Sequence, residues 1–260
     1  MRDILKDLQD GESADPMRSA QAAMKAPLPK RFYKEAVAGQ APEGHRVLLD
    51  GKPVRTPARN PLAVASPVLA DMLAAEFAAQ REHIDPATMP LLRLINTALD
   101  GVAGNEQAIK EDIQRFAGSD LLCYRADGPQ GLVDAQAEHW DAVLDWVRGR
   151  LGVQFVLAEG VMHVTQPRVA ISAIGAWLAG VTDPLRLAAL HTLTTLTGSA
   201  LLAIALSEGF VDTDALWAAA HVDEDWNIAQ WGGDAEAAER RAYREAEMRA
   251  AAAVLAEIGQ

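Results

Sequence analysis

Apolar and polar residues alternate in short runs between residues 45 and 65, a period of two that is typical of half-buried strands. The segments 45–50 and 52–55 flank Asp50 and Gly51, two residues that accept the left-handed backbone of a type I′ turn. These segments are therefore predicted to form a β-hairpin. The run 62–65 is predicted to add another strand.

Beyond residue 66 the apolar positions recur every three or four residues, which is the period of an amphipathic helix. Ser66 can cap the first of these helices, and Asn105 can cap the third. The apolar stripes are Leu69, Leu73 and Phe77 in the first helix, Leu91, Ile95, Leu99 and Val102 in the second, and Ile109, Ile113 and Phe116 in the third. The first half is therefore predicted to be a small antiparallel sheet with helices.

The second half is predicted to be almost entirely helical. Long helices are expected over residues 184–209 and 213–230, and further helices over residues 133–151, 167–181 and from Asp234 onward. The pattern as a whole predicts an α+β N-terminal domain followed by an all-α C-terminal helical bundle.

The domain division follows from these patterns. Residues 1–29 are polar and weakly patterned, and they are expected to form a mobile N-terminal arm. The α+β domain is assigned to residues 30–125 and the helical bundle to residues 126–260.

Charge and composition narrow the class of protein. The 260 residues carry 24 Lys and Arg against 36 Asp and Glu, a net charge of −12, and no nucleic-acid binding is expected because that requires a basic surface. The single cysteine, Cys123, excludes a disulfide framework and a multi-thiolate metal site. The N-terminal residues are charged from Arg2 and lack an apolar core, so the expected compartment is the cytoplasm.

Residues 187–207 contain no charged side chain and are long enough to be considered as a membrane span. His191, Gly198, Ser199 and four threonines lower their hydrophobicity, and the flanking charges indicate no topology. The segment is therefore interpreted as a buried helix of the bundle, and no stable membrane insertion is expected.

The C-terminal region is strongly acidic. No Lys or Arg occurs from residue 187 to residue 239, whereas nine Asp and Glu do. Trp217, Ile228 and Trp231 would share one helical stripe, so at least two tryptophans are expected to be buried. Two interpretations stay open: a solvated acidic face over packed aromatic residues, or a docking surface in which aromatic anchors lie inside a charged rim.

Motifs for catalysis are absent, since there is no phosphate-binding loop, dinucleotide fingerprint or nucleophile elbow. His221, Asp223 and Asp225 are the best candidate for a metal site, but residue 223 points away from the other two on a helix, so no metal is assigned. No catalytic residue is assigned either. An enzyme that uses surface carboxylates or Cys123 stays open as the alternative to a binding protein.

Eight segments, in order along the chain, resemble one protein family. They are KRFYKEA (30–36), LDGKPVRTP (49–57), MPLLRLINTALDGV (89–102), SDLLCYRA (119–126), HWDAVLDW (139–146), GVMHVTQP (160–167), LTGSALLAIAL (196–206) and DEDWNIAQWGGDAEAAERR (223–241). Together they resemble the assembly chaperones of the F-type ATP synthase catalytic head, the family that protects the isolated α subunit.

The resemblance implies a chaperone without enzymatic activity or cofactor, monomeric when free. It would bind the unassembled ATP synthase α subunit and prevent its aggregation until the β subunit replaces it. It would act in the bacterial cytoplasm, whereas eukaryotic members of the family would be in the mitochondrial matrix. The family's acidic C-terminal region, carried to this sequence, gives these partner-binding residues: Asp223, Glu224, Asp225, Trp231, Asp234 and Glu236.

Two positions depart from the family pattern. Phe77 stands where Trp is usual, and Asn227 stands where Gln is more common. Glu76 and Gln80 would share a helix face, and their role is left open.

Overall fold

The computed structural model describes residues 28–160 and 162–258. Most of the predicted arm, residues 1–29, therefore lies outside the described residues. Within the described chain, residues 28–32 and 80–85 form a small unit of their own. All the strands and helices discussed below belong to the larger, second unit.

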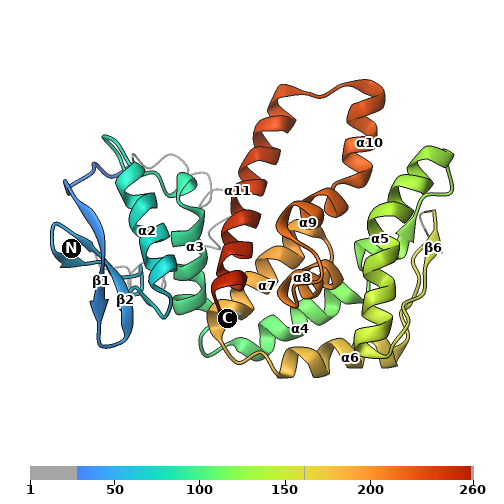
Figure 1. Ribbon diagram of the computed structural model, residues 1–260, viewed down its shortest axis with the longest axis horizontal. Coiled ribbons are helices and arrows are strands. Elements are labelled where there is room, and N and C mark those ends of the chain that lie inside the picture. Colours follow the sequence, from blue (N-terminus) through green and yellow to red (C-terminus); the bar gives the residue numbers. More distant parts are fainter. Residues whose placement is uncertain (1–27, 161, 259–260) are drawn as a thin grey trace, which may run out of the picture. The chain divides into compact units, whose positions relative to one another are not determined.

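Four short strands form an antiparallel sheet in which β1 (Ala36–Ala41) pairs with β2 (Gly44–Leu49), and β2 also pairs with β3 (Lys52–Pro53) and β4 (Ala63–Val64) (Figure 1). The predicted hairpin is confirmed, since Asp50 and Gly51 have φ values of 47° and 78° in the turn between β2 and β3. Strand β1 has no counterpart in the sequence prediction, because its sequence AVAGQA lacks alternating large apolar residues.

Helix α2 (Pro67–Ala79) packs on β1 and β2 through the predicted stripe, since Leu69, Leu73 and Phe77 are all buried. The predicted cap is also confirmed, because Ser66 Oγ accepts a hydrogen bond from Leu69 N (3.2 Å). The sheet and this helix therefore form one apolar layer between them.

Helix α3 (Pro90–Thr97) follows the short 3-10 turn η1 (Pro86–Thr88) and continues into a π-helical segment, η2 (Ala98–Val102). Leu99 lies within this wider π turn, which shifts the helical phase, so it is only half-buried and the predicted stripe is interrupted there. Helix α4 (Glu106–Ala117) comes next. Asn105 is the N-cap residue of α4 as predicted, but its side chain makes no capping hydrogen bond, and its Nδ2 donates to the carbonyl oxygen of Gly101 (3.0 Å).

Helices α5 (Gln130–Leu151) and α6 (Arg168–Ala179) confirm two further predictions. Gly152 ends α5 with a left-handed φ of 68°. An extended stretch connects the two helices, and its strand β6 (Ala158–Glu159) pairs in parallel with β5 (Tyr124–Arg125).

Two of the predicted helices, over residues 184–209 and 213–230, are each divided in two. The first contains α7 (Pro184–Thr197) and α8 (Ala200–Ser207), because Gly198 is left-handed (φ 69°) and Ser199 Oγ caps α8 by accepting from Leu202 N (3.0 Å). The second contains α9 (Thr213–Ala220) and α10 (Val222–Trp231), which are separated at His221. The last helix is α11 (Ala235–Ile258).

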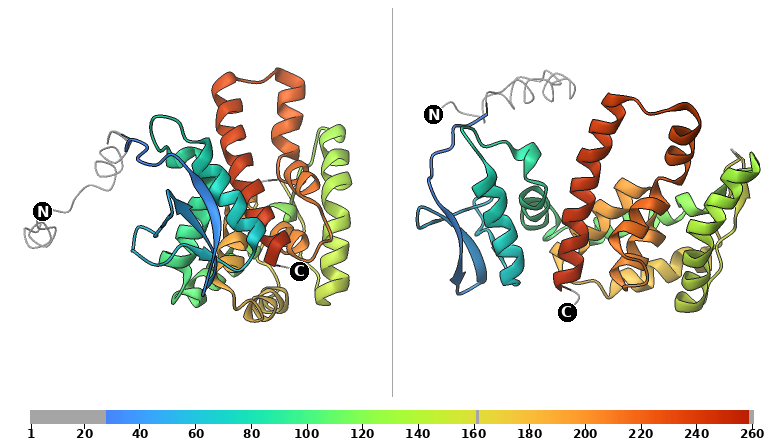
Figure 2. Two further views of the ribbon diagram at one scale, coloured as in Figure 1. Left: turned by 60° about the vertical axis from the view of Figure 1, so that its left-hand side comes forward. Right: turned by 45° about the horizontal axis from the view of Figure 1, so that its top comes forward.

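Helix α7 contacts α4, α8 and α11, and α11 also contacts α2 and α3 (Figure 2). Leu187, Leu193 and Leu201 are 0% exposed, which confirms that the uncharged segment 187–207 is core. No helix in the described ranges is long and apolar enough to cross a membrane.

The predicted fold class is confirmed, since a small antiparallel sheet with helices precedes a helical part. The contacts of α3 with α11 and of α4 with α7 join elements from both sides of residue 125. The division into domains at that residue stays a prediction.

Candidate partner-binding site

Helices α10 and α11 and the loop between them form a helical hairpin that projects from the neighbouring helices (Figure 1, Figure 2). Helix α10 ends where Gly232 takes a φ of 83°. Asp234 caps α11 as predicted, because its Oδ2 accepts from Ala237 N (2.9 Å). Every residue from 227 to 236 is exposed, and we call these residues the hairpin tip.

The aromatic residues of the hairpin divide between core and surface. Trp231 is 86% exposed and Ile228 is 39% exposed, so the prediction that both share a buried stripe with Trp217 is wrong. The reason is the break at His221, which puts α10 out of phase with α9. Trp226 instead packs on α5, where a methyl group added to Gly131 would overlap its ring.

Three of the predicted site residues lie in the first turn of α10, where negative charge is favoured by the helix dipole. Asp223 Oδ1 accepts from Gln136 Nε2 of α5 (2.7 Å). Asp225 Oδ1 pairs with Arg241 Nη1 of α11 (2.5 Å). Glu224 Oε2 lies 3.9 Å from His221 Nε2. Asp223 and Asp225 therefore also fasten α10 to its two neighbouring helices.

The arginines beside these acids come from α11. The sequence alone does not show this, because Arg240 and Arg241 lie beyond the stretch 187–239 that lacks Lys and Arg. Arg241 pairs with Asp225, and that hydrogen bond raises the pKa of its guanidinium. The same guanidinium lies 5.6 Å from the centre of the Trp217 ring. Glu236 pairs with Arg240 (2.5 Å) but keeps 80% of its side chain exposed. The structure thus brings all six predicted residues onto one hairpin, where Trp231 is 86% exposed and the Glu236 side chain 80% exposed.

Two groups considered for chemistry are buried away from solvent. His221 is 3% exposed; its Nδ1 donates to the carbonyl oxygen of Trp217 (2.8 Å), and burial lowers its pKa. In residues 28–160 and 162–258, no group of three or more His, Cys, Asp or Glu could hold a metal ion. Burial, with a contribution from Asp120, raises the pKa of the Cys123 thiol to about 12. A thiol that stays protonated is a poor nucleophile.

Glu76 has a structural role that the sequence left open. Its Oε1 and Oε2 accept hydrogen bonds from Leu91 N and Leu92 N, both at 2.8 Å, and so cap α3 from α2. Burial raises the pKa of this carboxyl group. Phe77 lies edge-on to Tyr33, with ring centres 6.0 Å apart, so the position makes an aromatic contact in this chain.

Comparison with known proteins now adds to this geometry. The family model of the ATP12 chaperone protein matches residues 30–148. Atp12 from Paracoccus denitrificans has a crystal structure that is 38% identical in sequence, with a TM-score of 0.78 over 87% of this chain and 97% of that chain. The chain belongs to the ATP12 chaperone family.

Two further solved structures are similar to this chain. A point mutant of P. denitrificans Atp12p is 37% identical, with the same coverage and a TM-score of 0.78. The Atu1473 protein of Agrobacterium tumefaciens, a proposed chaperone, is 53% identical, with a TM-score of 0.83 over 98% of this chain and 96% of that chain. The hairpin tip lies outside residues 30–148, so the family model does not bear on its role.

Proposed function

We propose that this protein is an assembly chaperone of the F-type ATP synthase that binds the unassembled α subunit, without enzymatic activity or a cofactor, until the β subunit replaces it. Membership of the ATP12 chaperone family supports the chaperone class. In this proposal it is monomeric when free and acts in the cytoplasm. The binding surface is the hairpin tip with the acids around it: Asp223, Glu224, Asp225, Trp231, Asp234 and Glu236.

The observation that carries this assignment is the exposure of Trp231, 86%, at the end of a projecting hairpin. Burying a tryptophan removes roughly 150–250 Å² from water, which is about 4–6 kcal/mol before the costs of association. Tryptophan is accordingly enriched among the residues that dominate binding energy. A single large anchor gives useful affinity and still permits exchange for another subunit.

The acids around Trp231 favour a client with a basic rim. Glu236 is 80% exposed, so its charge can meet a partner without disturbing the hairpin. Complementary charge of this kind accelerates encounter and disfavours wrong partners more than it adds affinity.

The test is suppression of aggregation. Isolated α subunit is diluted with the wild-type protein or with Trp231→Ala, and light scattering is followed without nucleotide. We expect the wild type to suppress scattering and Trp231→Ala to lose most of that effect. The matched control is Val169→Ala, which also truncates a well-exposed apolar side chain (65% exposed) but lies on α6.

A second pair of variants tests the charge. Glu236→Lys should weaken capture of the α subunit, whereas Asp214→Lys should not, although both carboxylates are about 80% exposed and paired with an arginine. If Trp231→Ala and Glu236→Lys are both folded and capture the α subunit as well as the wild type does, the hairpin tip is not the binding surface. Failure of the wild type to protect the α subunit, or equal protection of isolated β subunit, would refute the proposed client.

A further inference from the structure

Helices α3, α7 and α11 enclose a hollow of about 350 Å³, and Figure 1 shows α3 beside α11 in this part of the molecule. Its wall is mostly polar, since Arg93, Asn96 and Thr97 come from α3, Thr192 from α7 and Glu247 from α11. The volume is at the lower end of the range of roughly 300–1,000 Å³ that is usual for ligand pockets. The hollow therefore suits a small polar group.

Two side chains of this wall have polar atoms without a partner. Arg93 Nε and Asn96 Oδ1 are buried and make no hydrogen bond with any residue of the described chain. Arg93 Nη2 lies 2.8 Å from Glu247 Oε1 in an ion pair, but the two groups are not aligned for a hydrogen bond. Buried polar groups are nearly always hydrogen-bonded in native proteins. A bound group that supplies the missing acceptor and the missing donor would account for both exceptions.

The structure holds these two side chains next to each other. The guanidinium carbon of Arg93 lies 5.1 Å from the centre of the Tyr243 ring, and Glu247 holds the same side chain at one end. Arg93 and Asn96 are three residues apart on α3, so they are neighbours on one helix face. Both are only half-buried. A single small group can therefore reach both when their polar ends turn toward the hollow.

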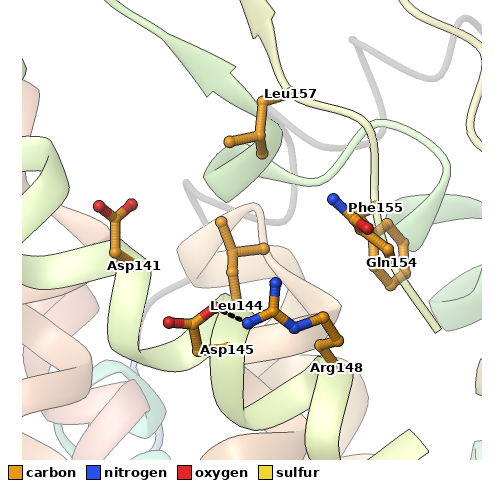
Figure 3. A pocket seen from close by; sticks show the side chains of 7 residues that line it. All are labelled: Asp141, Leu144, Asp145, Arg148, Gln154, Phe155 and Leu157. Atoms are coloured by element: carbon orange, nitrogen blue, oxygen red, sulfur yellow. Dashed lines mark ion pairs between the residues drawn. The ribbon is translucent and has the colours of Figure 1, made fainter. Parts of the chain in front are cut away.

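The hollow beside α5, of about 270 Å³, provides a contrast (Figure 3). Asp145 pairs there with Arg148 (2.9 Å), and Asp141 pairs with Arg125 (2.7 Å). Within the part of the chain that the structure describes, none of the side chains lining that hollow has a buried polar atom without a partner. Unmet hydrogen bonding is therefore a property of the hollow at Arg93 and not of surface hollows in general.

The charges around Arg93 disfavour an ionic ligand. Glu247 already pairs with Arg93, and Arg93 also lowers the pKa of the nearby Glu76, which burial raises. A carboxylate ligand would add a third negative charge and offer no donor to Asn96, whereas an ammonium group would offer no acceptor to Arg93. A carboxamide is uncharged and carries a carbonyl acceptor and an N–H donor on one edge. It is therefore the group that fits both unpaired atoms.

The hollow also continues the proposed client surface along α11. Glu236, Arg240, Tyr243 and Glu247 follow one another at spacings of four, three and four residues, so they share one face of the helix. Glu236 and Glu247 are about 17 Å apart along the helix axis, which is the length of roughly five residues of extended chain. A client segment that runs from the hairpin tip along this face therefore reaches the hollow.

We propose that this hollow is a second contact for the client and takes the carboxamide of an Asn or Gln side chain. The identity of the partner rests on the proposed function. The carboxamide oxygen accepts from the Arg93 guanidinium, and the carboxamide NH₂ donates to Asn96 Oδ1. The aliphatic part of the side chain packs against Pro90 and Leu94, the apolar residues of the wall. The hollow thus selects an uncharged polar side chain, whereas the hairpin tip offers an aromatic ring and acids.

Binding of the carboxamide is tested first without the client. The probe is N-acetylglutamine methylamide, and its glutamate and methionine analogues, which share the same backbone groups, are the controls. The Arg93 Nε–H signal and the Asn96 side-chain amide signals of the full-length protein are followed by ¹⁵N NMR. We expect saturable shifts of both with the glutamine compound. Binding of either analogue should be at least about tenfold weaker, since neither can make both hydrogen bonds.

Two substitutions separate binding from folding. Asn96→Ala removes an acceptor that has no partner, so the urea midpoint should stay the same or rise, whereas probe binding should weaken about tenfold. Arg93→Lys keeps the positive charge beside Glu247 but removes the guanidinium fork, and it should also weaken binding. The matched control is Gln107→Ala, which removes an exposed side-chain amide on α4 and should bind the probe normally.

The second arm uses the α subunit. Asn96→Ala should reduce the suppression of aggregation, whereas Gln107→Ala should not. Four results would overturn the proposal: no shift of the Arg93 and Asn96 signals, equal binding of the analogues, a clear loss of stability in Asn96→Ala, or undiminished protection of the α subunit by that variant. Failure of the wild type to protect the α subunit would refute the proposed client. The NMR titration does not contain that subunit, so the two failures are distinguishable.

Discussion

Asp120 is a fully buried carboxylate between the short 3-10 helix η3 (Leu121–Cys123) and α8. Its Oδ1 accepts from Ser199 Oγ (2.7 Å) and Leu122 N (3.2 Å), and its Oδ2 accepts from Leu201 N (3.0 Å). Burial raises the pKa of this carboxyl group from 3.8 to about 6, although the hydrogen bonds act in the opposite direction. The perturbation is Asp120→Asn, which removes the titration and keeps the shape.

The direction in which stability changes with pH follows from proton binding. A carboxyl group whose pKa is higher in the folded chain binds its proton more tightly there, so its stabilising contribution is complete below the unfolded pKa and is lost as the pH rises through the folded pKa. With pKa values of 3.8 and about 6, raising the pH from about 5 to about 7.5 lowers the free energy of unfolding by about 1–2 kcal/mol.

The assay is urea unfolding followed by circular dichroism at both pH values. Asparagine does not titrate, so the destabilisation caused by Asp120→Asn should be about 1–2 kcal/mol larger at the lower pH. Contributions from all other groups cancel in this difference. Asp145→Asn, at a side chain that is 67% exposed, is measured in the same assay as a surface control. A destabilisation that is constant, or that grows with pH, would refute the reasoning.

Three further predictions concern packing and accessibility. Gly131→Ala would push a methyl group into the Trp226 ring and should lower stability by about 1–3 kcal/mol. Gly149→Ala in the same helix meets nothing within 4 Å and should raise stability by up to about 1 kcal/mol. Thermal unfolding measures both variants, and equal effects would contradict the packing of Trp226 on Gly131. Glu76→Ala leaves Leu91 N and Leu92 N without their acceptor and should cost about 1–3 kcal/mol in denaturant unfolding; a neutral result would exclude the capping role. Native Cys123 should resist iodoacetamide at pH 8 and react fully in urea, and rapid native labelling would reopen its role as a nucleophile.

The elements that could be predicted from the sequence are those that carry their own signal. Asp50 and Gly51 require a tight turn, and Ser66 before Pro67 starts a helix wherever the rest of the chain lies. Strand β1 lacks such a signal, because it is specified by pairing with β2 and by the close approach of Gly39 to Leu48, where an added Cβ would lie 2.8 Å from Leu48 Cδ1. Small residues such as these give no alternation of apolar and polar positions from which a strand could be predicted.

The breaks within the predicted helices also depend on contacts that are distant in sequence. Gly198 is tolerated in an apolar helix, and what makes it a break is Ser199, whose hydroxyl caps α8 while donating to Asp120, a residue 79 positions away in sequence. Likewise, the phase of α10 depends on the break at His221, so the exposure of Trp231 could not be predicted from helical spacing. Local patterns predict where helices form, and tertiary contacts decide where they end.

That distinction also divides the predicted site residues by role. Asp223 and Asp225 connect α10 to α5 and α11, and Asp234 caps α11. Reversing any of these charges would alter the hairpin itself, so a loss of client capture would not separate binding from folding. Trp231 and Glu236 face solvent at the same tip. Their substitution leaves the contacts of Asp223, Asp225 and Asp234 in place. The role of the hairpin in binding therefore depends on these two positions, and a chain that keeps its fold while losing capture at both would locate the contact there.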